Sequence, residues 1–355
     1  MIDEEKNQTI LVIRLSAMGD VAMTVPVLHS LKKQHPNLNI IMLTTYGNDP
    51  MFDHLPGVHL VHFDRHGKHK GLSGVFRVWW KLRRNYSIDY IADLHNVIRS
   101  RLLTTLFRLT SPHMKIRHVD KERKERRKLV LLGYKKYGHP LSSAFERYRR
   151  VFESLGIRFD FDFKTIFSRK TPDLEEDMLE YFGPKENKRW VGVAPFAGHR
   201  SKIYPMKRME RFLELLNQQE NIEIFLFGHG NERPKINDWE NKFKNVHSMP
   251  RGTYLPQELE LMAHLDVMVS MDSANMHLAS LVNTPVVSIW GATHRYAGFL
   301  GWGQKVENVV ELPLDCRPCS IYGERHCPKG TYECMRDIDP QTIVDKVLQQ
   351  LSSLN

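Results

Sequence analysis

The chain alternates between short apolar runs and amphipathic segments, and in its first half this pattern predicts strands followed by helices. Short apolar runs bounded by turn residues are typical of buried strands, whereas apolar residues that recur every three or four positions are typical of helices. We predict strands at Thr9–Leu15, Asn39–Thr44, His59–Phe63 and Tyr90–Asp93. We predict helices at Val21–Lys33, Gly74–Arg84 and Ile98–Leu109.

The second half repeats this pattern. Strands are predicted at Trp190–Pro195, Ile222–Gly228, Val267–Ser270 and Pro285–Trp290. Helices are predicted at Met206–Gln218, Pro256–His264, Ala274–Leu281 and Pro340–Leu351, the last as an amphipathic closing helix. Because alternating strands and helices form parallel sheets, the two series predict an α/β protein with two doubly wound domains.

Turn-forming residues separate the two series. They gather in Ser168–Asp173 and Phe182–Lys185, which predicts a linker between residues 165 and 188. We therefore expect a first domain over residues 1–168, a second domain over residues 186–335 and a closing helix over residues 336–355. A chain of 355 residues is long enough for two cores of ordinary size.

Charge and hydropathy narrow the choice of partner and compartment. Fifty-one Lys and Arg residues against 41 Asp and Glu residues give a net charge of +10, which favours nucleic acid, anionic lipid or a phosphorylated small molecule as partner. The first eight residues lack the basic start and apolar stretch of a signal peptide, and no later apolar run approaches the length of a membrane span. We expect the protein to stay in the cytoplasm.

The loop after the first predicted strand contains a carboxylate, Asp20, preceded by Gly19. Open α/β sheets bind ligands at the carboxyl ends of their strands, so Asp20 is a candidate general base. Gly19 lets the backbone approach a ligand closely. The alternative is that Asp20 only caps the helix that follows it.

Three polar loops follow strands of the second half. The helix after Asp272 should begin near Ser273, and its free N–H groups and dipole would form an anion site there, with His277 in its first turns. In the second loop, Lys202 is placed to meet a diphosphate as a point charge. In the third, the Glu232 carboxylate could accept hydrogen bonds from ribose hydroxyls. The alternatives are a core histidine, a helix cap and solvated loop charges.

Five stretches of the chain together form a recognisable set of motifs. They are Arg14–Val21, Asp93–Ser100, the Lys202 loop, Met271–His277 and the cysteine-containing tail from Cys316 to Ile338. With these motifs the chain resembles glycosyltransferase family 9, the heptosyltransferases of the bacterial lipopolysaccharide inner core, over nearly its whole length. The Thr-Gly of that family is Ser273-Ala274 here, which adds only a methyl group.

This resemblance implies a GT-B architecture, in which two Rossmann-like doubly wound domains face each other across a cleft. The implied activity is inverting, metal-independent transfer of a heptose or related sugar from a nucleotide-diphosphate sugar, ADP-heptose, to the lipopolysaccharide inner core or a lipid A-linked acceptor. No cofactor is implied, and Asp20 becomes the catalytic base. The implied donor-binding residues are Gly19, Ser201, Lys202, Glu232, Asp272, Ser273, Ala274 and His277.

The densest basic run of the chain is Lys121–Lys128. Such runs are usually solvated helix faces, but the acceptor of the resembled family is an anionic glycolipid at the inner leaflet. The run could also hold the enzyme to anionic lipid as a peripheral contact with the inner membrane. Nucleic acid fits the charge but explains neither Asp20 nor the donor loops. The residues expected to bind the acceptor are His95, Arg99, Arg101, Arg123, Lys124, Arg126 and Arg127.

Two groups of residues raise the question of a metal ion. The triplet Asp160-Phe161-Asp162 is of the Asp-x-Asp type, but it lies in the alternating run Phe159–Phe163, which predicts an edge strand with solvated carboxylates. We therefore expect no catalytic metal. The four cysteines lie close together in the sequence and are candidates for a structural zinc site or for reduced thiols: Cys316, Cys319, Cys327 and Cys334.

Alternatives from other functional classes stay open to different degrees. A Rossmann dehydrogenase should show G-x-G-x-x-G after its first strand, and Ser16–Asp20 does not fit that pattern. A non-catalytic nucleotide-sugar-binding protein would be expected to have lost the base, whereas Asp20 is present. A transferase for another cell-surface glycan is also compatible with these residues.

Overall fold

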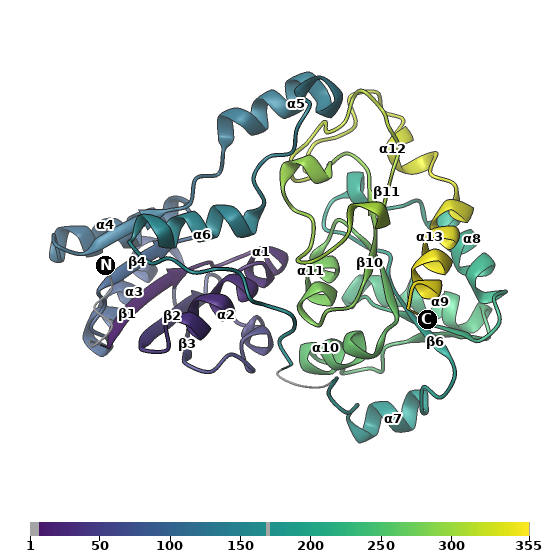
Figure 1. Cartoon of the computed structure of the whole chain (residues 1–355), viewed down its shortest axis with the longest axis horizontal. Helices are drawn as coiled ribbons and strands as arrows, with labels where there is room; N and C mark the ends of the chain where they lie inside the picture. Colours follow the sequence, from purple (N-terminus) through teal and green to yellow (C-terminus); the bar gives the residue numbers. More distant parts are fainter. Residues whose placement is uncertain (1–6, 168–170, 355) are drawn as a thin grey trace. The chain divides into compact units, whose positions relative to one another are not determined.

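Parallel strands form two separate sheets, and helices connect the strands of each sheet (Figure 1). The computed structural model describes residues 7–167 and 171–354. The chain divides into two units, one of Met1–Lys121 and Ser142–Ile166, the other of Glu122–Leu141 and Phe167–Asn355. Residues 168–170 of the predicted linker and the first six residues lie outside the described part of the chain.

The sheet of the first unit has five parallel strands in the order β3-β2-β1-β4-β5. The strands are β1 (Gln8–Ile13), β2 (Leu38–Thr44), β3 (Val58–His62), β4 (Tyr90–Asp93) and β5 (Lys115–His118). The helices are α1 (Met18–Ala22), α2 (Val25–Gln34), α3 (Gly71–Asn85), α4 (Ile98–Thr110) and α6 (Ala144–Ser154), with a 3-10 turn, η1 (Asp49–Met51). At the end of β1, Ile13 pairs with Leu43 and with Asp93, so the carboxyl ends of β1, β2 and β4 lie side by side.

One helix predicted in this unit is two helices. The expected segment Val21–Lys33 is interrupted between α1 and α2, and the Thr24 hydroxyl donates a hydrogen bond of 2.7 Å to the Val21 carbonyl at the break. Pro26 lacks an N–H and therefore suits the first turn of a new helix. As a consequence Asp20 lies inside α1 and not in a loop before it.

The segment Phe159–Phe163 is not the edge strand that we expected. Its backbone bonds to side chains of α2: the Asp160 N–H donates to Gln34 Oε1 at 3.0 Å, and the Asp162 N–H donates to Ser30 Oγ at 2.9 Å. The alternation of the sequence is nevertheless preserved, since Phe159 and Phe163 are buried while Asp160 and Asp162 are exposed.

The sheet of the second unit has six parallel strands in the order β11-β10-β9-β6-β7-β8. The strands are β6 (Arg189–Ala194), β7 (Ile222–Leu226), β8 (Val246–Ser248), β9 (Val267–Met271), β10 (Val286–Trp290) and β11 (Val309–Glu311). The helices are α5 (Arg123–Tyr137), α7 (Glu176–Phe182), α8 (Met206–Asn217), α9 (Arg233–Lys242), α10 (Leu255–His264), α11 (Ala274–Leu281), α12 (Glu333–Arg336) and α13 (Pro340–Ser352). The 3-10 turns are η2 (Arg200–Lys202), η3 (Gly230–Glu232), η4 (Arg295–Ala297) and η5 (Val306–Asn308).

The predicted closing helix is α13, which packs beside α8 (Figure 1). Its apolar residues Ile343, Val344 and Val347 are fully buried in the core of the second unit. Among the helices of the described residues, none is long and apolar enough to cross a membrane.

Helix α5 belongs to the second unit, although we placed its residues in the range 1–168. The Tyr134 ring stacks on His294 with ring centroids 4.2 Å apart, and the Tyr134 N–H donates a hydrogen bond of 2.9 Å to the Arg317 carbonyl. Gly133 has φ +73°, and a Cβ there would lie 2.5 Å from the Asp315 carbonyl oxygen, so the site requires glycine. These contacts link residues far apart in sequence, and local periodicity gives no sign of them.

Candidate functional site

Lys202 and Asp272 meet at the carboxyl edge of the second sheet. Lys202 ends η2, which follows β6, and Asp272 follows the neighbouring strand β9. Lys202 Nζ lies 2.9 Å from Asp272 Oδ2, and the two side chains are only 15% and 7% exposed. The same carboxylate oxygen accepts a hydrogen bond of 2.8 Å from the Thr293 hydroxyl. Both residues were predicted to belong to one site, and the structure brings them together.

The Lys202 side chain is held by a loop from the cysteine-containing tail. Gly323 has φ +85°, and a Cβ there would lie 2.8 Å from Lys202 Cε. The adjacent Ser201 is buried, and its hydroxyl donates to the Gly323 carbonyl at 2.6 Å. The Ser201 hydroxyl thereby anchors the Lys202 loop, and its expected contact with the donor stays a prediction.

Helix α11 begins directly after Asp272. Ser273 occupies the N-cap position with extended backbone angles, and its hydroxyl lies 3.2 Å from that of Ser270. Ala274 is the first helical residue, and His277, in the same helix, is buried. The first backbone N–H groups of a helix have no acceptor within the helix, so this end of α11 suits an anion.

Glu232 lies at the loop after β7, as predicted, but its carboxylate caps a turn. Glu232 Oε2 accepts a hydrogen bond of 3.1 Å from the His229 N–H. The His229 ring pairs with the buried Glu258 carboxylate at 2.9 Å. This hydrogen bond raises the pKa of His229.

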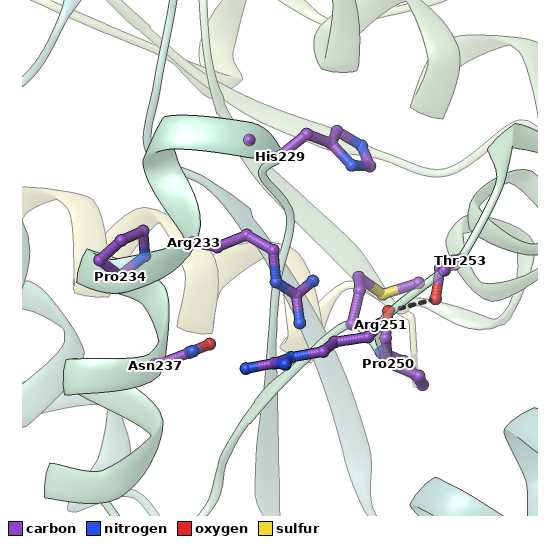
Figure 2. A pocket seen from close by; sticks show the side chains of 10 residues that line it. His229, Arg233, Pro234, Asn237, Pro250, Arg251 and Thr253 are labelled. Carbon is purple, nitrogen blue, oxygen red and sulfur yellow. Dashed lines mark hydrogen bonds between the residues drawn. The ribbon is translucent and has the colours of Figure 1, made fainter.

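A cavity of about 430 Å³ opens beside this turn, between the segments that follow β7 and β8. Figure 2 shows the guanidinium groups of Arg233 and Arg251 pointing into the same space, with His229, Asn237 and Thr253 around them. Neither arginine was among the residues predicted from the sequence. Strand β8 has only three residues, too few for an apolar run, so nothing in the sequence placed Arg251 at the sheet edge.

In the first unit, Asp20 forms an ion pair with Arg14, which directly follows β1. Arg14 is buried, and its Nη1 also donates a hydrogen bond of 2.8 Å to the Leu94 carbonyl. The Asp20 carboxylate is 26% exposed, so it is oriented by the guanidinium yet accessible to a ligand. Arg14 was quoted in a motif but not predicted as a site residue. Gly19 lies within α1 of this unit.

His95 lies at the same sheet edge as Asp20. Its Nδ1 accepts a hydrogen bond of 3.4 Å from the Leu15 N–H, so the proton of the neutral ring lies on Nε2. Burial, together with the positive charge of Arg14, lowers the pKa of His95 to about 4. The ring is therefore neutral at physiological pH and can donate a hydrogen bond from Nε2.

The buried Asp93 carboxylate orders the loop that carries His95. It accepts hydrogen bonds from the His95 N–H at 3.0 Å, the Asn96 N–H at 2.8 Å and the Ser100 hydroxyl at 2.8 Å. Burial acts to raise the pKa of Asp93, but the hydrogen bonds from His118, Asn96 and Ser100 outweigh it and lower the pKa. A charged Asp93 thus fixes the start of α4.

The predicted acceptor-binding arginines and lysine fall into two groups. Arg99 and Arg101 lie exposed on α4 in the first unit, and Arg123, Lys124 and Arg127 lie exposed on α5 in the second. Arg126 differs, because it is buried with its guanidinium over the Phe299 and Tyr322 rings and donates a hydrogen bond to the Tyr322 hydroxyl. Its contacts tie α5 to the second unit, which corrects the expected role in acceptor binding.

The four cysteines of the tail are free thiols with different exposure, from the exposed Cys316 to the buried Cys334. All four, with Cys319 and Cys327 of intermediate exposure, line one small cavity of about 20 Å³. Among residues 7–167 and 171–354, no three His, Cys, Asp or Glu side chains are arranged as metal ligands. The structural zinc site stays a prediction.

The chain has the GT-B architecture that the family resemblance implied. Each of its two α/β units contains a sheet of parallel strands, with polar side chains at the carboxyl edge. The sequence profile of glycosyltransferase family 9 (heptosyltransferase) matches residues 75–329. The chain therefore belongs to this family and is a glycosyltransferase, as its motifs indicated.

Relatives of known structure or name match nearly the whole length of the chain. Lipooligosaccharide heptosyltransferase 2 of Campylobacter jejuni subsp. jejuni serotype O:6 is 22% identical over 345 residues, covering 93% of this chain and 95% of that protein. A family 9 glycosyltransferase from Veillonella parvula DSM 2008 has a TM-score of 0.74 at 16% identity, covering 98% of both chains. The heptosyltransferase WaaC of E. coli with ADP has a TM-score of 0.66 at 17% identity, covering 97% of this chain and 100% of that one. At these identities the structural likeness establishes the fold.

Proposed function

We propose that the protein transfers a heptose from ADP-heptose to the inner core of lipopolysaccharide or to a lipid A-linked acceptor. The observation that carries this proposal is the Lys202–Asp272 pair beside the start of α11, because it provides a lysine and free N–H groups for a diphosphate. Family membership supports the sugar, and the E. coli relative WaaC has been solved with ADP and with ADP-2-deoxy-2-fluoro heptose.

The second unit holds the donor in this proposal. The diphosphate is surrounded by Lys202, Ser273, Ala274 and His277. Asp272 orients the Lys202 side chain. The cavity with Arg233 and Arg251 lies at the edge of the same sheet and would accept the nucleotide. As the bond from the anomeric carbon to the diphosphate breaks, the lysine and the α11 N–H groups stabilise the negative charge on the leaving oxygen.

Asp20 is the catalytic base in this proposal. Its carboxylate takes the proton of an acceptor hydroxyl while that oxygen forms the new bond to the anomeric carbon, on the face opposite to the diphosphate. One displacement of this kind inverts the configuration at the anomeric carbon. Arg14 keeps the Asp20 carboxylate in position, and the neutral His95 donates a hydrogen bond to the acceptor from Nε2.

The proposed acceptor is chosen for its charge. Exposed basic side chains suit the phosphates of an anionic glycolipid. They are Arg99, Arg101, Arg123, Lys124 and Arg127. We propose that the enzyme works in the cytoplasm, in peripheral contact with the inner face of the inner membrane. No nucleic acid partner is proposed.

The transfer needs no divalent metal in this proposal, because Lys202 and the α11 N–H groups counter the charge of the diphosphate. The Asp160-Phe161-Asp162 triplet is not proposed as a metal site, since the Asp162 carboxylate pairs with Lys33 and both backbone N–H groups bond to α2.

The test is a transfer assay with a heptose-free inner-core glycolipid as acceptor and ADP-heptose, UDP-glucose and GDP-mannose as separate donors. We expect only ADP-heptose to give a product, larger by one heptose in the mass spectrum and inverted at the anomeric carbon by NMR. Transfer from another donor would indicate a transferase for a different cell-surface glycan. Tight binding of ADP-heptose with no transfer to any acceptor would indicate a non-catalytic nucleotide-sugar-binding protein.

A further inference from the structure

Helix α3 exposes a continuous stripe of large apolar side chains. Leu72, Phe76 and Trp80 are 75%, 52% and 56% exposed, and they follow one another at intervals of four residues. Side chains four positions apart lie on the same face of a helix. The adjoining face of α3 packs on the sheet, with Val75, Val78, Trp79 and Leu82 buried. The rings of Phe76 and Trp80 lie beside that of Trp79, with centroids 4.9 and 6.0 Å apart. The stripe therefore widens the apolar surface of α3 beyond the part that packs on the sheet, and this added part faces solvent.

Basic side chains border the stripe. Arg77, Lys81 and Arg84 are exposed on α3, each one position or a full turn away from an apolar residue of the stripe. Counted over its length, α3 has four basic residues and no acidic one.

Helix α4 packs beside α3. Like α3, it combines exposed apolar side chains with basic residues and has no acidic residue. The Arg83 guanidinium donates a hydrogen bond of 3.1 Å to the Thr110 carbonyl at the end of α4. On α4, Ile98 and Leu109 are 85% and 75% exposed. This helix has three basic residues, Arg99, Arg101 and Arg108, all exposed, and again no acidic one.

This combination of side chains suits binding to an anionic lipid surface. It places Leu, Phe and Trp next to Arg and Lys and contains no acidic residue. The apolar groups enter the boundary between head groups and acyl chains, and the cations meet the lipid phosphates. Trp is especially suited to this boundary because one edge of its ring is apolar and its N–H is polar. A face that only met water would gain nothing from three large apolar side chains in line.

We propose that the α3–α4 surface docks on an anionic phospholipid bilayer, with Leu72, Phe76 and Trp80 inserted and the flanking arginines and lysines on the lipid phosphates. The inference rests on the proposed function only for its purpose, which is to bring the enzyme to a glycolipid acceptor. It also moves the lipid contact away from the basic run of α5, where Glu125 pairs with Lys128 at 2.8 Å and Arg126 is buried.

The experiment measures binding of the full chain to vesicles of phosphatidylglycerol and phosphatidylethanolamine, with pure phosphatidylcholine vesicles as the uncharged comparison. We expect sedimentation with the anionic vesicles only, weakening as salt rises. The variant L72S/F76S/W80S should lose at least tenfold in vesicle binding, and R77S/K81S/R84S should lose a similar factor at low salt. The matched control L179S/Y181S removes two exposed apolar side chains of α7, 45% and 53% exposed, and should bind like the wild type.

Trp80 provides a direct readout. All six tryptophans lie in the described part of the chain, and Trp80 is the only one among the exposed large apolar residues. Its fluorescence should shift to shorter wavelength on anionic vesicles and be quenched by brominated lipid. In W80F, which keeps an apolar side chain, binding should persist while this quenching disappears.

Three outcomes would overturn the proposal. In the first, L72S/F76S/W80S binds vesicles like the wild type. In the second, only the α5 variant R123S/K124S/R127S loses vesicle binding. In the third, the stripe forms a contact between two copies of the chain. The last would appear as a wild-type dimer in sedimentation equilibrium that L72S/F76S/W80S converts to monomer, with no vesicle binding by either. Melting temperature and ADP affinity, which the stripe does not touch, report whether the variant is folded and whether the donor site is intact. A failure of docking is thereby separated from a failure of the proposed transferase activity.

Discussion

The Lys202 ammonium and the Asp272 carboxylate lie 2.9 Å apart in a site where both side chains are largely shielded from water. Neighbouring strands β6 and β9 bring their loops together, and Thr293 and Gly323 fix the carboxylate and the lysine stem. The lysine is therefore oriented before any donor binds. Orientation in advance reduces the entropy that a diphosphate would have to remove on binding.

Replacing Lys202 should weaken donor binding and leave the fold intact. K202M removes one charge-assisted contact of about 1.5–3 kcal/mol, which corresponds to at least a tenfold loss of ADP affinity by calorimetry. D272N should cause a smaller loss, because the lysine stays but loses its fixed orientation. The control is K207M on the exposed surface of α8, which should bind ADP like the wild type. Wild-type affinity in both K202M and D272N would place the donor site elsewhere.

Asp20 should be needed for turnover and not for donor binding. D20N keeps the size of the side chain but cannot accept the proton of the acceptor hydroxyl, so kcat should fall by about 10² to 10⁴. Transfer is measured at saturating donor and acceptor, with ADP affinity as the check on the fold. D53N changes an exposed carboxylate of the same unit and serves as the control. A D20N enzyme that retains more than about a tenth of the rate excludes Asp20 as the base.

Two adjacent arginines of α5 should behave differently. R126S removes a buried guanidinium from the Phe299 and Tyr322 rings and should lower the free energy of unfolding by about 1–3 kcal/mol. R127S, on the exposed face, should leave the melting temperature unchanged and raise the KM for the glycolipid acceptor at low salt. Denaturant titration and acceptor kinetics at two salt concentrations measure both effects. Equal stability of the two variants would show that the Arg126 contacts contribute nothing.

The partly buried Glu311 carboxylate should make stability depend on acid pH. Burial acts to raise its pKa, but the hydrogen bond with His294 and the charge of Arg317 lower the pKa to about 2, from 4.5. Its contribution is therefore complete above pH 4.5 and is lost as pH falls towards 2, and by 1.36 kcal/mol per unit it is on the order of 3 kcal/mol.

The measurement is the free energy of unfolding from pH 7 to pH 3 for the wild type and E311Q. The destabilisation caused by E311Q should be largest at neutral pH and should shrink as pH falls. E307Q changes an exposed carboxylate nearby and should follow the wild type. A destabilisation by E311Q that is the same at every pH would contradict the assignment.

Transfer should survive removal of divalent ions. After treatment with EDTA the rate should equal that of the untreated enzyme, because Lys202 and the α11 N–H groups provide the positive charge at the diphosphate. The assay is repeated with added magnesium. A loss of activity that magnesium restores would return Asp160 and Asp162 to consideration as ligands.

Strong apolar runs made the central strands predictable. Strand β4 and helix α11 have the predicted limits, since burial of both faces of a strand leaves a clear run of apolar residues. Strand β5 reads Lys-Ile-Arg-His and was missed, because only one of its four residues is apolar. Helix α9 was missed for the same reason: its ten residues contain only Ile236 and Trp239 on the buried side.

The candidate site was predictable where chemistry coincides with a strand end. Lys202 and Asp272 were predicted in this way, and the structure places them 2.9 Å apart. Arg14 was not, because an arginine that extends an apolar run looks like the last residue of a strand, and only the fold shows that it turns towards Asp20. The contact of Ser201 with Gly323 joins residues 122 positions apart and has no local signal.

The placement of α5 with the second unit makes the division of the chain discontinuous. The backbone passes between the units three times, at residues 121–122, 141–142 and 166–167. A gene fragment that ends at residue 168 would express the first unit with α5 attached, its Tyr134 ring without His294 and its Gly133 turn without Asp315. The complementary fragment would lack the helix that covers those groups. Each unit can be produced alone only if residues 122–141 are transferred from one gene fragment to the other.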